Sequence, residues 1–269
     1  DCALIFWQLR LPRVILALAC GAALATAGVV MQALFRNPLA EAGLMGVSSG
    51  AALGFGLGLS LGLTGVYSLP LSAFACALLF CALAWGIAKR FPSQHAGLIL
   101  AGVALNALAN SLLSLISYAA DDHTLRSLVF WGMGSLSGID WPRLLVTAPI
   151  LLIVSIALRF YWRSLNAWLL GEHTAQLLGF NTHRLRWQWL VLVALLVGIS
   201  VALCGVIGFI GLLVPHTLRL LIGGDHQQLL PSSALAGATL LLVADTLAQW
   251  LIAPAELPVG LITSLLGAP

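Results

Sequence analysis

The sequence contains very little charge. Of its 269 residues, 8% are charged and 61% are hydrophobic, and the mean hydropathy is +1.04. Ordinary soluble domains carry charge on about 25% of their residues. The composition therefore excludes an ordinary soluble protein. It predicts an all-α polytopic membrane protein, because only structures with internally satisfied backbones can span lipid.

Lysine is nearly absent, and no basic stripe is present. Lys89 is the single lysine beside eleven arginines, which are scattered singly or in pairs between apolar runs. Proteins that bind nucleic acid cluster their basic residues and interleave them with aromatic residues. The net charge of +3 therefore gives no reason to expect a nucleic-acid partner.

Motifs that carry chemistry are also missing. We find no nucleophile–base pair, no metal cage and no phosphate loop, so we expect no catalytic residue, no bound cofactor and no metal. The cysteines lack metal-ligand spacing and are interpreted as small apolar core residues. No signal peptide is visible, since residue 1 opens directly into a segment that ends at Arg10 and Arg13. The five cysteines are Cys2, Cys20, Cys76, Cys81 and Cys204.

Long apolar runs are what the sequence does contain. Pro215 is expected to kink or break the run that holds it. The segment 119–142 is amphipathic and aromatic, so we interpret it as an interfacial helix. The last run, from Leu257 to Pro269, is too short to span. The predicted spans are 14–35, 47–64, 69–88, 96–118, 143–161, 187–207, 209–222 and 232–252, with a partial one from about 258.

The arginine and lysine count in alternate loops predicts the orientation, because cytoplasmic loops are enriched in both. The set with more basic residues is assigned to the cytoplasm, and the set with fewer to the outside. The first set is Arg36, Lys89, Arg90, Arg159, Arg163, Arg184, Arg186 and Arg219, and the second is Arg10, Arg13, Arg126 and Arg143.

Two polar segments interrupt the apolar pattern. Residues 36–51 form a glycine-punctuated hinge after the first run, where Pro38 prevents the helix from continuing. Residues 163–187 form the longest polar cytoplasmic segment. Within it, we predict a short helix with Glu172 in its first turn, Ala175 and Leu178 on one face, and Gly179 at its end. Such a helix could dock into a groove on a soluble partner, and a plain connecting loop is the alternative.

Motifs along nearly the whole chain resemble the iron-siderophore, haem and vitamin B12 permease family of ABC importers. The sequence departs from the family in lacking the first spanning helix, in stopping within the last one, and in having Gln249 where members often carry arginine. The matching motifs are Arg10-Leu11-Pro12-Arg13, Asn37-Pro38-Leu39-Ala40-Glu41, Gly171-Glu172, Leu178-Gly179, Gly208 to His216, Asp225-His226 and Ala255 to Gly260.

The resemblance implies a ten-helix type II importer permease, here a single transmembrane domain over 1–269, in a bacterial inner membrane. It implies a homodimer with the pathway on its axis. Two ATPase subunits, which hold ATP and Mg²⁺, would dock on one side and a periplasmic substrate-binding protein on the other.

The resemblance also assigns roles to residues. Gly171, Glu172, Ala175, Leu178 and Gly179 resemble the segment that couples ATP binding to the membrane helices. Arg10 and Arg13 resemble arginines that pair with glutamates of the binding protein; anchoring at lipid headgroups is the alternative. The predicted gate comprises Asn37, Leu39 and His95 within the Ser93–Ala96 turn, and the predicted pathway face comprises Asn106, Asn110, Ser111 and Ser114.

Three ionisable residues in or near spans suggest a different class of protein. Asp245 lies inside a predicted span, so it should have a partner, and His216 and Arg219 share a helix face. Structural bridging is the favoured role. An ion-coupled secondary transporter would instead use these residues as a relay, and a structural membrane subunit is a further alternative.

The substrate prediction rests on the resemblance of the segment after Tyr118 to the haem branch of the family. Vitamin B12 is the runner-up, and a ferric siderophore comes third. Haem contacts could involve Tyr118, His123, Met133 or Met31, and ordinary packing is the alternative for each.

Overall fold

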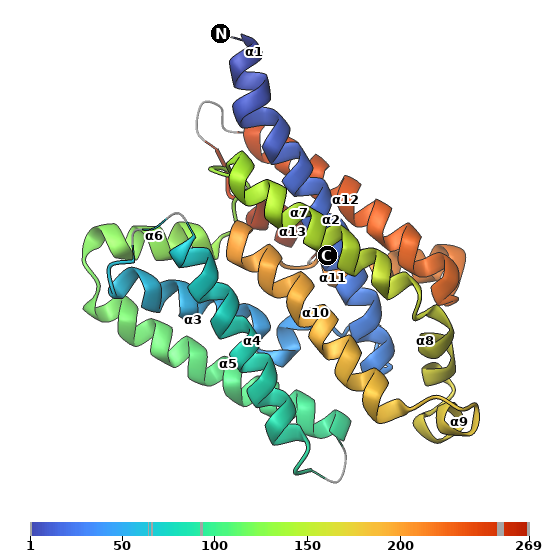
Figure 1. The fold of residues 1–269 in the computed structure, drawn as a ribbon. Helices are drawn as coiled ribbons and strands as arrows, with labels where there is room; N and C mark the ends of the chain where they lie inside the picture. The colour runs from blue at the N-terminus through green and yellow to red at the C-terminus, as the bar shows by residue number, and fades with distance from the viewer. Residues whose placement is uncertain (1, 64, 66, 92–93, 252–255, 268–269) are drawn as a thin grey trace. The chain divides into compact units, whose positions relative to one another are not determined.

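The computed structural model describes all residues except 1, 64, 66, 92–93, 252–255 and 268–269, and gives no side-chain description for 2, 94 and 95. All regular structure in this described part is helical, as the apolar runs predict (Figure 1). The chain divides into two compact units. The first contains residues 1–41, 136–196 and 208–269, and the second contains 42–135 and 197–207.

The first unit is built around one long helix, α2 (Leu11–Phe35), which is preceded by α1 (Cys2–Ile5) and the π-helix η1 (Phe6–Arg10). Helix α2 packs against α7, α8, α11 and α12 of the same unit. The remaining helices are α7 (Trp141–Arg159), α8 (Trp162–Leu169), α9 (Glu172–Leu177), α10 (Thr182–Cys204), α11 (Ile210–Ile222), α12 (His226–Trp250) and α13 (Val259–Gly267). Only the part of α10 up to Leu196 belongs to this unit.

Glycines let α2 and α12 approach until their backbones touch. A Cβ atom added to Gly21 would lie 2.3 Å from the carbonyl oxygen of Gly237, and one added to Gly237 would lie 2.4 Å from that of Gly21. Small residues allow this close packing between membrane helices. Nearly all of α2 from Leu16 to Leu34 is buried as a result.

The sequence predicts that Pro215 kinks or breaks its helix, and the structure excludes the break. The helix runs from Ile210 to Ile222 with Pro215 inside it. Proline lacks the N–H that would bond to the carbonyl of Gly211, four residues earlier. That carbonyl faces Gly28 of α2, where an added Cβ would lie 1.8 Å from the oxygen. The glycine leaves room for the freed carbonyl against a neighbouring helix, so the helix can continue.

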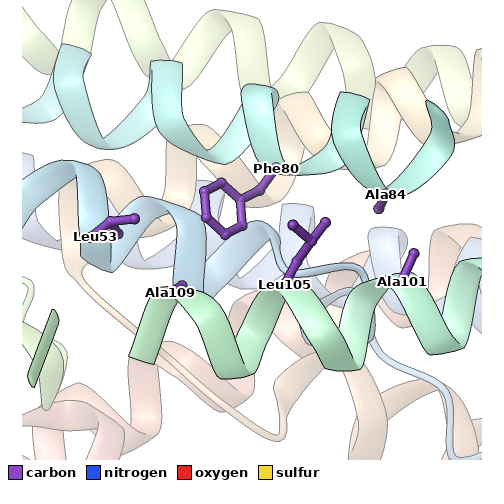
Figure 2. Close-up of a cluster of buried hydrophobic side chains, with 6 residues drawn as sticks. All are labelled: Leu53, Phe80, Ala84, Ala101, Leu105 and Ala109. Carbon is purple, nitrogen blue, oxygen red and sulfur yellow. The ribbon is translucent and has the colours of Figure 1, made fainter. Parts of the chain in front are cut away.

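The second unit contains η2 (Ala42–Met45), α3 (Val47–Ser60), α4 (Ser68–Ala88), α5 (Gln94–Ala119), α6 (Asp122–Gly132) and the end of α10. Its core lies where α3, α4 and α5 meet (Figure 2). Phe80 of α4 lies there among Leu53 of α3 and Leu105 of α5. Alanines complete the cluster and keep the helices close; they are Ala84, Ala101 and Ala109.

Six helical segments in the described part are long and apolar enough to cross a membrane, and α3 and α11 are shorter apolar helices. The predicted span 47–64 is therefore too long: α3 ends at Ser60. Its 14 residues rise about 21 Å at 1.5 Å each, less than the roughly 30 Å of a hydrocarbon core. The count of ten helices stays a prediction.

Two helix starts also differ from the prediction. Helix α10 begins at Thr182 instead of 187, and α12 begins at His226 instead of 232. Asp225 explains the second start, because its carboxylate accepts a 3.0 Å hydrogen bond from the backbone N–H of Gln227. This is N-capping, which starts a helix at the polar residue and not at the first apolar one.

Candidate functional site

The predicted coupling segment folds as two short helices, α8 and α9, that are tied to α10. Glu172 begins α9, as predicted, and accepts a 2.7 Å hydrogen bond from Arg186 of α10. The guanidinium of Arg186 also lies over the ring of Trp168 in α8, 5.1 Å from its centroid. A cation over an indole face is an attractive arrangement. Arg186 therefore joins the beginning of α9 to the end of α8.

Trp168 anchors the same segment to the unit core. Its side chain is fully buried, its indole N–H donates to the backbone carbonyl of Leu34 at 3.2 Å, and its ring meets Trp189 edge to face at 5.2 Å. Leu34 lies in the last turn of α2. The segment is therefore held by α2 and α10 and is not a freely solvated loop.

The end of α9 confirms the predicted stop at Gly179. This glycine has φ = +87°, and its N–H bonds to the carbonyl of Gln176, while that of Phe180 bonds to Ala175. This pair of bonds is the Schellman pattern, which favours glycine at the left-handed position.

The predicted shared face of Ala175 and Leu178 is wrong. Ala175 is buried in the unit, whereas Leu178 lies just past the helix and is exposed. The helix has only six residues, and its small residue packs inward. Leu177, which the sequence interpretation did not select, is 76% exposed. The outward apolar surface of α9 is thus formed by Leu177 and Leu178.

Asp245 lies near the C-terminal end of α12 and is paired with Arg13 of α2, as a charged residue inside a span requires. Arg13 donates to both carboxylate oxygens of Asp245 at 2.8 and 2.9 Å, and a third hydrogen bond of 2.8 Å reaches Glu256. Gln249 adds a 2.8 Å bond to Asp245. The Arg13 and Asp245 side chains are only 13% and 3% exposed.

This geometry changes the prediction for the two arginines. The Arg13 side chain is engaged within its own unit, so it is not free to reach a docking protein as the sequence interpretation expected. Arg10 lies one turn earlier, at the end of η1, and is exposed. Of this predicted pair, only Arg10 offers an accessible guanidinium.

The predicted gate residues lie just after α2. The N–H of Asn37 bonds to the carbonyl of Gln32 and that of Arg36 to Ala33, which closes α2 with Arg36 in the left-handed region. The Asn37 side chain accepts a 3.0 Å bond from the N–H of Leu39, whose own side chain is exposed. The side chain of His95 and residue Ser93 lie outside the described part of the chain.

The predicted pathway face on α5 separates into two kinds of residue. Asn106 is half-buried, donates to the carbonyl of Gly43 at 3.0 Å and contacts the hydroxyl of Ser49, so it holds η2 and α3 on α5. Asn110, Ser111 and Ser114 are exposed in the unit. Only these three form a polar, accessible strip.

The four candidate haem contacts also differ in access. Tyr118 is 91% exposed, and His123 and Met133 are exposed as well. Met31 is fully buried within α2 packing, which favours ordinary packing for it. No group of three His, Cys, Asp or Glu residues suited to a metal ion occurs among the described residues.

Comparison with known proteins identifies the type of molecule to which these helices belong. The family model described as the FecCD transport family matches residues 2–269. The chain belongs to the FecCD transport family. It is 47% identical over 270 residues to the hemin transport system permease protein HmuU of Yersinia pestis, covering 98% of this chain and 81% of that protein.

Two further similarities support the same conclusion. The vitamin B12 import system permease protein BtuC of Yersinia enterocolitica is 45% identical over 99% of this FecCD chain and 80% of its own length. A solved structure described as an inward-facing metal-chelate type ABC transporter superimposes with a TM-score of 0.94 at 39% identity. That match covers all of this chain and 87% of the other. The chain is thus a multi-pass permease subunit of the FecCD family.

The sequence interpretation gave no role to Asn166, Trp168 or Gln32, which hold elements together in the first unit. Gln32 is buried in α2, donates to the carbonyl of Leu212 at 3.1 Å and accepts from Arg219 at 3.2 Å. Arg219 thus bridges α11 and α2, which confirms the structural bridging role predicted for it. A buried glutamine inside an apolar run was the signal that could have revealed this contact, because buried polar groups need partners.

Proposed function

We propose that this chain is the membrane permease subunit of an ATP-driven ABC importer that moves haem across a bacterial inner membrane. The observation that carries the proposal is the 47% identity to a hemin permease over 98% of the chain. The exposed Tyr118, His123 and Met133 support it, because haem is recognised by apolar surroundings and occasional His, Met or Tyr ligands.

Vitamin B12 is the second candidate substrate, favoured by BtuC relatives that are 45% identical over nearly the same length. Both cargoes are large metal chelates of a macrocyclic ring, so a weakly binding pathway could serve either. A channel that bound its cargo tightly would release it slowly, and specificity would then reside mainly on the binding protein.

In this proposal two copies of the chain form the pathway, and each receives an ATPase subunit at α8 and α9. The exposed Leu177 and Leu178 provide apolar anchors for a groove on that subunit. The Glu172–Arg186 pair fixes the orientation of α9, so movement of the ATPase would be passed to α10. Arg10 would meet an acidic group of the substrate-binding protein.

The test is transport by the assembled complex. The permease is reconstituted in liposomes with its ATPase and binding protein, and uptake of haem, cyanocobalamin and a ferric siderophore is measured with ATP or a non-hydrolysable analogue. We expect ATP-dependent haem uptake that is insensitive to an uncoupler. Uptake that stops when an uncoupler removes the ion gradient, and that does not require ATP, would instead establish a secondary transporter.

The coupling residues are tested in the same system. Glu172→Ala should leave a folded permease but abolish ATP-driven uptake, since α9 would lose its tie to Arg186. Thr174→Ala, on the same short helix, is the matched control and should transport normally. Normal transport by Glu172→Ala would show that the coupling assignment is wrong.

A further inference from the structure

Asn166 of α8 holds the N-terminus of α12 through three hydrogen bonds. Its amide N–H donates to Asp225 at 2.7 Å. Its carbonyl oxygen accepts from the backbone N–H of His226 at 3.0 Å and lies 2.6 Å from the Nδ1 atom of the His226 ring. One short side chain therefore engages two consecutive residues at the start of a long helix.

The chemistry of the partners fixes how this amide is oriented. A carboxylate can only accept, so the Asn166 nitrogen must face Asp225. A backbone N–H can only donate, so the Asn166 oxygen must face His226. Since that oxygen can only accept, the Nδ1 atom of His226 carries the proton. The three bonds are thus mutually consistent in one arrangement and not in the flipped one.

The position of Asn166 places this contact next to the proposed coupling segment. Asn166 lies two residues before Trp168, whose ring contacts Arg186, and Arg186 pairs with Glu172 of α9. His226 is fully buried. The contacts therefore run without a gap from α9 through α8 to the beginning of α12, all within the first unit.

We propose that Asn166 is a positioning residue that transmits movement of the coupling segment to α12. This inference rests on the proposed function, because it assumes that an ATPase acts on α8 and α9. When α9 is displaced, α8 moves with it through Trp168 and Arg186, and Asn166 then pulls or releases the first turn of α12. Without this contact α8 and α9 could move while α12 stays in place.

The experiment uses the full complex in liposomes, with haem as the probe and cyanocobalamin as a second one. Asn166→Asp sets two carboxylates against each other, and Asn166→Leu removes all three bonds at a similar side-chain volume. Gln228→Leu is the matched control, since it also replaces an amide by leucine, lies in the first turn of α12 and is exposed outside the Asn166 contacts. The swap Asn166→Asp with Asp225→Asn rebuilds a carboxylate–amide pair with the roles exchanged.

We expect both Asn166 variants to assemble with the ATPase and to hydrolyse ATP, but to lose uptake roughly tenfold, within the range that coupling between sites spans. The control should keep wild-type uptake, and the swap should restore uptake to near that level. A residue with a purely structural role would lower assembly, hydrolysis and uptake together.

Three outcomes would overturn the inference. The first is normal uptake in both Asn166 variants, the second is uptake lost only in proportion to assembly, and the third is a swap no better than Asn166→Asp. The wild-type complex separates this result from the proposed function. If wild type shows no ATP-driven uptake, the proposed function fails; if it transports and the Asn166 variants do too, only the inference fails.

Discussion

The two ends of α12 are held in place by different chemistry. Near its C-terminal end, Asp245 is bound by the charged Arg13, and the pair is almost inaccessible to solvent. At its N-terminal end, the neutral amide of Asn166 binds Asp225, which is exposed, and His226, which is buried. The first end depends on a charge pair inside the protein. The second depends on one hydrogen bond to an exposed carboxylate and two to a buried histidine.

This difference has consequences for rigidity. Breaking a buried ion pair leaves one charge without compensation, which is strongly unfavourable. Breaking a hydrogen bond to an exposed carboxylate leaves a group that water can solvate again. The Asp245 end is therefore suited to stay closed. At the other end the bond to exposed Asp225 can exchange with water at small cost, and the two bonds to buried His226 carry the resistance to opening. A helix that transmits movement needs one fixed end and one adjustable end.

The largest expected effect comes from the middle of α12, where Gly237 packs against Gly21 of α2. Gly21→Val should prevent stable packing, because even its Cβ would lie 2.3 Å from a backbone oxygen of Gly237. We expect little folded protein in detergent, measured by size-exclusion chromatography.

Gly86→Val in α4 is the matched control for this substitution, since its added Cβ would meet nothing within 4 Å beyond its chain neighbours and its own helix backbone. It should yield folded protein close to the wild-type amount. Equal yields of the two variants would contradict the close approach of α2 and α12.

The next largest effect is expected at the Arg13–Asp245 pair, near the C-terminal end of α12. Arg13→Ala should lower the free energy of unfolding by about 3 kcal/mol, because Asp245 would remain buried without its cation. The measurement is the thermal unfolding midpoint in detergent. Arg13→Met combined with Asp245→Leu should recover much of the loss, since no buried charge remains. A double variant as unstable as Arg13→Ala would show that packing, and not charge, dominates here.

Local patterns in the sequence predicted much of this architecture. Apolar runs located α2, α4, α5 and α7, and Gly179 correctly marked the end of α9. These features depend on neighbouring residues, through hydrophobicity and backbone conformation. The start of α12 was missed because capping by Asp225 overrides the apolar pattern.

The candidate site was harder to predict because it is built from distant residues. Arg13 and Asp245 are 232 positions apart, and Asn166 and Asp225 are 59 apart. No local pattern indicates that such residues meet. Asp245 could be expected to have a partner, yet the identity of that partner followed only from the α2–α12 crossing. The buried position of Ala175 likewise depends on what packs against α9.

A smaller effect is expected from pH at the Asp225 end. The hydrogen bond from the Gln227 backbone N–H, helped by the Asn166 amide, holds the pKa of Asp225 below its usual value. A lowered pKa in the folded state means that the ionised form is stabilising above the unfolded pKa of about 3.9. This contribution is lost as pH falls through the folded pKa. The Tm difference between wild type and Asp225→Asn should thus be constant from about pH 7 to 5. It should shrink toward zero below about pH 4.

The smallest effect is expected at Glu256, which shares Arg13 with Asp245 but is 50% exposed. Glu256→Gln should change the free energy of unfolding by less than about 1 kcal/mol, as exposed ion pairs do. Arg13 keeps both bonds to Asp245 in that variant, so the buried charge stays compensated. Thermal unfolding of Glu256→Gln and Arg13→Ala in one detergent makes the comparison. Similar losses in the two would mean that the charged end of α12 depends on all three residues together, and that its resistance to opening does not come from the buried Arg13–Asp245 pair alone.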